Sequence, residues 1–135
     1  MGDKLRVVVV DDYRFFRESV AKVLHVDPDI DVVGQGGTAA EAVQLAAELL
    51  PDIVTLDISM PGGGLVAAQQ IAATCPVTKI VMLTSSDDKN DVKAALKAGA
   101  RAYVLKDVHP RELVQILRRV WVGEAYVTPA LSISL

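Results

Sequence analysis

Acidic, hydroxyl and basic side chains stand at the ends of several short apolar runs in this sequence. Asp11 and Asp12 follow four consecutive valines, Asp57 ends a later run, and Thr84 and Lys106 follow two more. Carboxylates brought within a few ångströms repel one another, and a hard divalent cation relieves that repulsion. One or two carboxylates, waters and a phosphate oxygen form a ligand set that suits Mg²⁺. The three acids therefore predict a magnesium site.

The other two side chains of this set suit a phosphoryl group. Lys106 carries a compact positive charge on a flexible stem, and the Thr84 hydroxyl can donate a hydrogen bond to a phosphoryl oxygen. Such groups stabilise a transferring phosphoryl group, and one carboxylate must then be the nucleophile. Asp57 is the best candidate, because it lies at a strand end between the other groups and precedes the glycine-rich turn at 61–64.

Each of these residues also has a simpler interpretation. Asp12 is of a type that often caps a following helix, and Lys106 is of a type that is usually solvated. Thr84 begins a polar Thr-Ser-Ser loop at 84–86. Their joint occurrence at four strand ends is much less expected by chance, so the set favours the functional interpretation.

These side chains need a scaffold that brings distant parts of the chain together. Apolar runs at 6–10, 30–33, 53–58, 79–83 and 102–105 predict strands. Apolar stripes between and after them predict five helices, the second opened by a capping box at 38–41. The alternation predicts an α/β fold, a doubly wound sandwich with one parallel sheet. Ligands bind such sheets at the carboxyl ends of the strands, where the five side chains would meet.

Composition narrows the class of protein. The 135 residues are 51% hydrophobic and 23% charged, which is typical of one globular domain that needs no disulfide or metal support. The single cysteine, Cys75, excludes an internal disulfide and suits a reducing compartment. No apolar run is long enough to span a bilayer and no signal peptide is apparent. We therefore expect a cytoplasmic protein without membrane contact.

Charge is distributed unevenly along the chain. The net charge is −3, which argues weakly against binding of nucleic acid by this chain alone. Residues 1–60 carry 11 acids and 5 bases, whereas residues 61–135 carry 6 acids and 9 bases. An acidic half suits a cation, and a more basic half suits an anion or an acidic partner.

Four motifs resemble the receiver domain of bacterial two-component response regulators. They are VVVDD at 8–12, LDISMPG at 56–62, LTS at 83–85 and AGARAYVLK at 98–106. Asp107 after Lys106 and GEAYVTP at 123–129 are similar to the NarL/FixJ (LuxR-type) branch. The resemblance covers residues 5–122 and implies a flavodoxin-like (βα)5 sandwich, with a five-stranded parallel sheet in the order 2-1-3-4-5.

The resemblance implies a role for each residue of the site. Asp57 accepts a phosphoryl group from the phosphohistidine of a sensor histidine kinase. Asp12, Asp57 and the backbone carbonyl of Ser59 bind Mg²⁺ directly, while Asp11 holds the ion through water. Lys106 pairs with the acyl phosphate. The domain is then no enzyme, apart from catalysing its own Mg²⁺-dependent phosphorylation and dephosphorylation.

A conformational switch is implied by the same resemblance. Thr84 moves to hydrogen-bond the new phosphoryl oxygen, and Tyr103 rotates inward behind it. Ser59 and Ser86 flank the phosphate, where the family tunes hydrolysis. Phosphorylation adds charge and strong hydrogen-bond acceptors, which suits a two-state device of this kind.

The helix between the two switch residues presents lysines at helical spacing, as a candidate partner surface: Lys89, Lys93 and Lys97. A solvated lysine face is the alternative on general grounds. Acids on the last helix of a second protomer would match these lysines, but the main ones are only Glu112 and Glu124. We expect a phosphorylation-dependent homodimer, and an interface through other helices is equally open.

Two departures from the family pattern bear on organisation. The loop Gly62–Gly64 is one residue shorter than is usual in the family, and it predicts a tight turn with positive φ. Residues 1–123 are expected to form the receiver domain, and 124–135 to begin a linker without a regular element of its own. The branch usually continues into a C-terminal helix-turn-helix domain. Because residues 124–135 resemble the start of the linker in that branch, we favour a chain cut in its linker, and a stand-alone receiver is the alternative. We expect transcriptional control and DNA contact only through the helix-turn-helix domain.

Three other functions fit the sequence less well. A phosphatase of the haloacid-dehalogenase type also forms an aspartyl phosphate, but the segment 57–59 lacks the second acid of its Asp-x-Asp signature. A dinucleotide-binding module would need the spaced Gly-x-Gly-x-x-Gly after the first strand, and GQGG at 34–37 does not match it. A receiver-like protein that only binds partners is disfavoured, because Asp12, Asp57, Thr84 and Lys106 are all intact.

Overall fold

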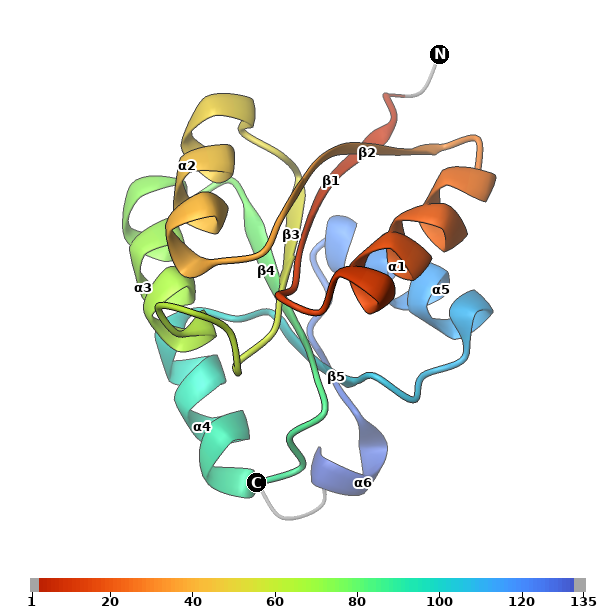
Figure 1. Cartoon of the computed structure of the whole chain (residues 1–135). Coiled ribbons are helices and arrows are strands. Elements are labelled where there is room, and N and C mark those ends of the chain that lie inside the picture. The colour runs from red at the N-terminus through yellow and green to blue at the C-terminus, as the bar shows by residue number, and fades with distance from the viewer. Residues whose placement is uncertain (1–2, 133–135) are drawn as a thin grey trace.

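The structure is a computed structural model that describes residues 3–132, with one sheet between two layers of helices (Figure 1). Its elements follow the alternation that the apolar runs predict. In chain order they are β1 (Leu5–Val10), α1 (Arg14–Val26), β2 (Ile30–Gly36), α2 (Ala39–Leu49), β3 (Ile53–Leu56), α3 (Gly64–Thr74), β4 (Lys79–Thr84), α4 (Lys89–Ala98), β5 (Ala102–Leu105), α5 (Pro110–Trp121), β6 (Tyr126–Val127) and α6 (Pro129–Ser132).

All strands run parallel, in the order β2-β1-β3-β4-β5-β6. The predicted flavodoxin-like order 2-1-3-4-5 is confirmed, with one strand more than expected. The added strand pairs Tyr126 and Val127 with Ala102 and Tyr103 of β5. The expectation of no regular element in 124–135 is therefore wrong for β6 and α6. A two-residue strand has no periodicity of its own and forms because β5 offers an edge; residues 133–135 lie outside the described residues.

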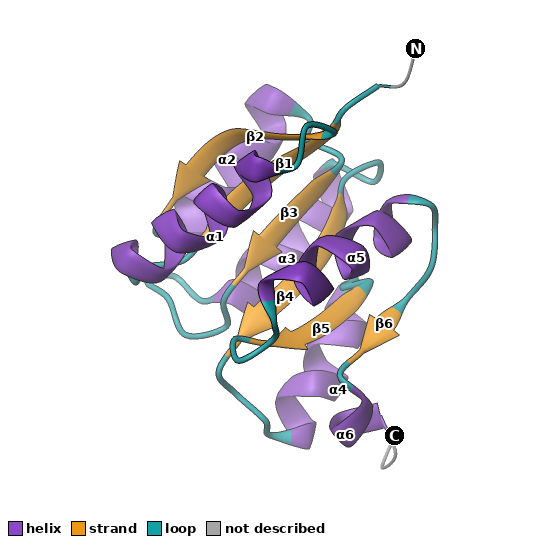
Figure 2. Cartoon of the chain, turned by 90° about the vertical axis from the view of Figure 1, so that its right-hand side faces the viewer, coloured by secondary structure: helices purple, strands orange, loops and turns teal. Residues whose placement is uncertain are grey.

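The central strands are buried on both faces. Helices α1 and α5 cover one face, and α2, α3 and α4 cover the other (Figure 1, Figure 2). Along β1, Val8 and Val10 pack under α2 and α3, whereas Val7 and Val9 pack under α1 and α5. Because successive strand residues point to opposite faces, a strand covered on both sides reads as the unbroken apolar run seen here.

The short loop after β3 is closed by glycines. Gly62 and Gly63 have φ values of +86° and +85°, as the tight-turn prediction requires. At Gly64 a Cβ atom would lie 1.9 Å from the backbone oxygen of Asp57, so the first residue of α3 touches the residue that directly follows β3. The loop of three glycines therefore folds back directly on Asp57.

Helix ends follow the local signals of the sequence. The Thr38 side chain accepts a hydrogen bond from the Glu41 N–H at the start of α2, and the Glu41 carboxylate accepts one from the Gly37 N–H. Asp88 caps α4 in the same way. None of the helices in the described part of the chain has the length and apolar character that crossing a bilayer requires.

Candidate functional site

Three carboxylates come together where β1 and β3 end, at the edge of the sheet to which the arrowheads point in Figure 2. One oxygen atom from each of Asp11, Asp12 and Asp57 lies within 4.8 Å of the other two. The chain passes from β1 to β2 on one side and from β3 to β4 on the other, so this is the point at which the strand order reverses. The structure thus brings the three predicted acids together.

Lys106 lies among these acids. Its Nζ is 2.8 Å from Asp11 Oδ2 and 2.8 Å from Asp57 Oδ2. Burial disfavours the charged ammonium, but the hydrogen bonds and charges of the two carboxylates outweigh burial and raise the pKa of Lys106. The ring of Phe16 on α1 lies 4.6 Å from the Nζ, measured to its centroid. The Lys106 ammonium is therefore fixed by ion pairs to two carboxylates and is not a freely solvated surface charge.

The two neighbouring acids after β1 have different surroundings. Asp11 is buried, and its Oδ1 accepts a hydrogen bond from the Tyr13 N–H at 2.9 Å. Asp12 is exposed and makes no hydrogen bond or ion pair with any described residue. The residue that caps α1 is Tyr13, without a side-chain hydrogen bond, so the capping interpretation of Asp12 is wrong. Asp12 thus presents a free carboxylate beside two buried ones.

Asp57 is buried, with 5% of its surface exposed. Its Oδ1 accepts a hydrogen bond of 3.3 Å from the Ser59 N–H, and its Oδ2 faces Lys106. Ser59 is exposed, and no donor within residues 3–132 reaches its backbone carbonyl. The carboxylate of Asp12, that of Asp57 and the Ser59 carbonyl supply only oxygen ligands, which is what a hard cation such as Mg²⁺ prefers.

Thr84 ends β4, the strand that pairs with β3, and is buried, with 1% exposed. Its Oγ1 accepts a hydrogen bond of 3.3 Å from the Ser86 N–H. The Ser86 carbonyl accepts a 2.8 Å hydrogen bond from the Tyr103 hydroxyl, and the Ser86 hydroxyl donates one to Asp91 at 2.5 Å. Thr84 and Tyr103 are thus linked through one loop residue.

Tyr103 lies inward, with no exposed surface. Burial raises the pKa of its hydroxyl, although the hydrogen bond to Ser86 opposes that change. The inward position is the one that the family resemblance assigns to the switched state. The structure records this single position, so the predicted rotation stays a prediction.

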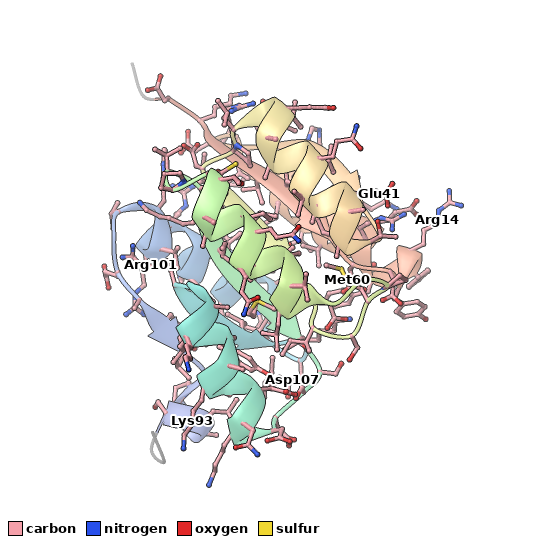
Figure 3. All side chains as sticks on the ribbon, turned by 90° about the vertical axis from the view of Figure 1, so that its left-hand side faces the viewer. Arg14, Glu41, Met60, Lys93, Arg101 and Asp107 are labelled. Atoms are coloured by element: carbon pink, nitrogen blue, oxygen red, sulfur yellow. The ribbon has the colours of Figure 1, made fainter. Side chains whose placement is uncertain are left out.

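The lysines of α4 face solvent. Lys89, Lys93 and Lys97 are exposed and form no ion pair with described residues, and Figure 3 shows Lys93 on the outer side of α4. Of the acids expected to meet them, Glu124 is already paired with Arg119 of its own chain at 3.1 Å. The lysine surface is exposed, but of the two acids expected to meet it in a second protomer, Glu112 alone lies on α5 and outside the pair with Arg119.

Sequence reasoning missed two contacts of the site. Phe16 belongs to the predicted apolar stripe of the first helix, and nothing in that stripe shows that its ring lies over Lys106. Arg17, one residue further, donates from Nη1 to the backbone oxygen of Asp11 at 2.9 Å. An arginine one turn after an acidic pair is a weak signal for such a contact, because its target is set by the tertiary fold.

Comparisons with known proteins agree with this geometry. The sequence profile described as "Response regulator receiver domain" matches residues 7–118. The chain is 37% identical to the oxygen regulatory protein NreC of Staphylococcus epidermidis and 33% identical to the transcriptional regulatory protein DegU of Brevibacillus brevis. The matches cover 97% and 98% of this chain but only 61% and 57% of those relatives. The chain thus spans about three-fifths of their length.

Solved structures show the same fold. The signal receiver domain of the response regulator NarL from Mycobacterium tuberculosis superposes with a TM-score of 0.88 at 33% identity, covering 91% of this chain and all of that one. A LuxR-family two-component response regulator from Aurantimonas sp. gives a TM-score of 0.90 at 31% identity, covering 96% of this chain and 94% of that one.

Proposed function

The chain belongs to the response regulator receiver domain family, in its NarL/LuxR-type branch, and on this premise we propose that Asp57 accepts a phosphoryl group from the phosphohistidine of a sensor histidine kinase. The observation that carries the proposal is the ammonium of Lys106, 2.8 Å from the Asp57 carboxylate, beside two further acids. A buried carboxylate between a cation and a metal-binding acid is the arrangement that phosphoryl transfer to an acid requires.

In this reaction an Asp57 oxygen attacks the phosphorus, and the bond from phosphorus to the donor nitrogen breaks. The product is an acyl phosphate on Asp57, and the kinase histidine, which carries a proton on its other ring nitrogen, leaves as neutral imidazole. Asp12, Asp57 and the Ser59 carbonyl would hold Mg²⁺, with Asp11 acting through water; the ion supplies positive charge to the phosphoryl oxygens.

The Lys106 ammonium would change its partner when Asp57 is phosphorylated. In the unphosphorylated site its ammonium bonds both Asp11 and Asp57. Once Asp57 is phosphorylated, the negative charge of the group lies on the phosphoryl oxygens, and the same ammonium can pair with one of them. The ring of Phe16 limits where the lysine stem can move.

The switch would run through Thr84. Its hydroxyl turns toward a phosphoryl oxygen, which changes the hydrogen bond that it now accepts from Ser86. Ser86 in turn holds the Tyr103 hydroxyl, so the loop before α4 and strand β5 would respond together. Ser59 and Ser86 lie on the two loops beside the phosphate and would tune its hydrolysis.

The partners of the whole protein are also proposals. The phosphoryl donor would be a sensor histidine kinase, and phosphorylation would favour a homodimer. Residues 1–123 would form the receiver and 124–135 the start of a linker to a DNA-binding output domain. The domain would catalyse only its own phosphorylation and dephosphorylation. The cytoplasmic location expected from the sequence stays a prediction.

A direct test uses a small phosphoryl donor in place of the kinase. The protein is incubated with Mg²⁺ and acetyl phosphate, and its intact mass is measured. We expect a gain of one phosphoryl group that Asp57→Ala abolishes, while Asp107→Ala, a matched removal of an exposed acid near Lys106, keeps it. A mass gain of one phosphoryl group that persists in Asp57→Ala would contradict the proposal. If the protein hydrolysed a small phosphoester over many turnovers, a phosphatase function would replace the proposed one.

A further inference from the structure

Arg17 ties the end of β1 to the end of β2. Its Nη1 donates a hydrogen bond to the backbone oxygen of Asp11 at 2.9 Å and makes a longer contact of 3.4 Å with that of Gly36. The Gly36 oxygen also accepts a hydrogen bond from the Asp11 N–H at 3.0 Å. The guanidinium therefore closes a small ring of hydrogen bonds around the backbone of Asp11.

Gly37 leaves the room that this arrangement needs. A Cβ atom at this position would lie 3.0 Å from Arg17 Nη1, 3.7 Å from the Asp11 oxygen and 3.8 Å from the Cα of Asp12. Residue 37 thus packs directly against the backbone of the acidic pair and against the guanidinium. This contact accounts for the last glycine of the GQGG segment, which matches no nucleotide-binding motif.

The guanidinium is held there at a cost. The Nε of Arg17 is buried and has no hydrogen-bond partner among the described residues. A buried donor without a partner is unfavourable, so a position that leaves one needs an explanation. The position of Arg17 is therefore set by the hydrogen bonds of its Nη1 to the two backbone oxygens, although this position leaves its Nε without a partner.

We propose that Arg17 is a positioning residue for the metal-binding acids, an inference that rests on the proposed Mg²⁺ site. Asp12 has no side-chain partner among residues 3–132, so within this part of the chain its backbone fixes where its carboxylate lies. Asp11 and Asp12 share that backbone, and Arg17 with Gly37 clamps it. Groups that contact the metal ligands, and not the metal itself, orient those ligands and contribute strongly to metal affinity.

The sign of the effect separates positioning from charge. A cation near three acids lowers their attraction for a metal ion, so removing it would tighten Mg²⁺ binding if charge alone mattered. Loss of positioning weakens binding instead. Arg17→Met is therefore informative whichever direction it takes, and Arg14→Met on the same helix is the matched control. The Arg14 side chain is 79% exposed, and its one ion pair with a described residue is that with Glu18.

The experiment measures Mg²⁺ affinity by calorimetric titration of the metal-free protein, with thermal melting to check folding. We expect Arg17→Met to weaken binding about tenfold and Arg14→Met to change it by less than about twofold. Hydrogen exchange of the Tyr13 amide, measured without metal, should accelerate in Arg17→Met only. Gly37→Ala retains the arginine charge but moves the guanidinium from its position, so it should also weaken Mg²⁺ binding. In a protein that already carries Arg17→Met, the same substitution should weaken binding less.

The outcomes are distinguishable. If the wild-type protein binds no Mg²⁺, the proposed function fails and this inference fails with it. If the wild type binds Mg²⁺ but Arg17→Met binds it equally or more tightly, the inference alone is overturned. Should Arg17→Met not fold, Gly37→Ala decides: unchanged Mg²⁺ affinity in that variant contradicts the clamp.

Discussion

At the scale of single residues, Lys106 balances the charge of the site. Asp11 and Asp57 are buried and share its ammonium, while Asp12 pairs with no residue of the described part of the chain. Removal of one partner from a buried ion pair leaves an uncompensated charge and is strongly destabilising. An acid that forms no ion pair beside two others has the opposite effect, because the two neighbouring carboxylates repel its charge. The site therefore holds both a stabilising and a destabilising residue.

This balance predicts opposite effects of two substitutions on stability without metal. Lys106→Met should lower the free energy of unfolding by about 2 kcal/mol. Asp12→Asn should raise it by about 0.5 kcal/mol. Urea denaturation in the presence of a chelator measures both, with Lys97→Met as the control for loss of an exposed lysine. Equal effects of Lys106→Met and Lys97→Met would contradict the charge balance.

At the scale of elements, an ion pair joins the end of α1 to α5. Arg118 on α5 donates to Asp27 at 2.5 Å, and Asp27 also accepts a hydrogen bond from the Asp29 N–H at 2.8 Å. The hydrogen bond from Arg118, followed by that from Asp29, lowers the pKa of Asp27 below 3.8. Because the folded state binds this proton less readily, the pair adds stability above pH 3.8 that is lost as pH falls through the lowered pKa.

The corresponding prediction concerns acid unfolding. Asp27→Asn should be less stable than the wild-type protein near neutral pH, and the difference should shrink as the wild-type carboxyl becomes protonated in strong acid. Urea denaturation from neutral pH to about pH 2 checks this. Glu18→Gln, in the exposed pair with Arg14, should show little difference throughout. A difference for Asp27→Asn that is independent of pH would be inconsistent with the pair.

The C-terminal elements β6 and α6 pack beside β5, the strand that carries Tyr103. The Thr128 N–H donates to the Tyr103 carbonyl at 3.0 Å, and the Leu105 N–H donates to Thr128 Oγ1 at 3.3 Å. Leu131 is buried in the same hydrophobic cluster as Tyr103. So short a strand and helix contribute few contacts, which is typical of a segment that opens on its own before the domain unfolds.

Local opening gives a third prediction. Leu131→Ala should speed hydrogen exchange of the Thr128 and Leu105 amides, while the free energy of global unfolding changes by less than about 1 kcal/mol. Native-state hydrogen exchange by NMR measures both quantities. Val122→Ala, which removes exposed apolar atoms just before this segment, is the control. A global loss of about 2–5 kcal/mol would instead make the segment part of the cooperative core.

Much of the complete fold can be predicted from the sequence, because burial leaves clear patterns in it. Strands covered on both faces appear as apolar runs such as 6–10, and parallel strands must bring Asp11, Asp12 and Asp57 to one rim. Contacts set by three-dimensional packing leave no such pattern. The register shift between Val7 and Val8 helps to decide which β2 residues face the acids, and the reach of Arg17 depends on that register.

Asp57 is the proposed phosphoryl acceptor of this fold, and finding the position of the phosphoryl group in the wild-type protein tests this proposal. After incubation with acetyl phosphate, borohydride reduction converts an aspartyl phosphate to homoserine, which peptide mass spectrometry then assigns to a position. We predict homoserine at position 57 alone, and none when a chelator removes divalent metal. Homoserine at another aspartate, or an unmodified position 57 with Mg²⁺ present, would contradict the account.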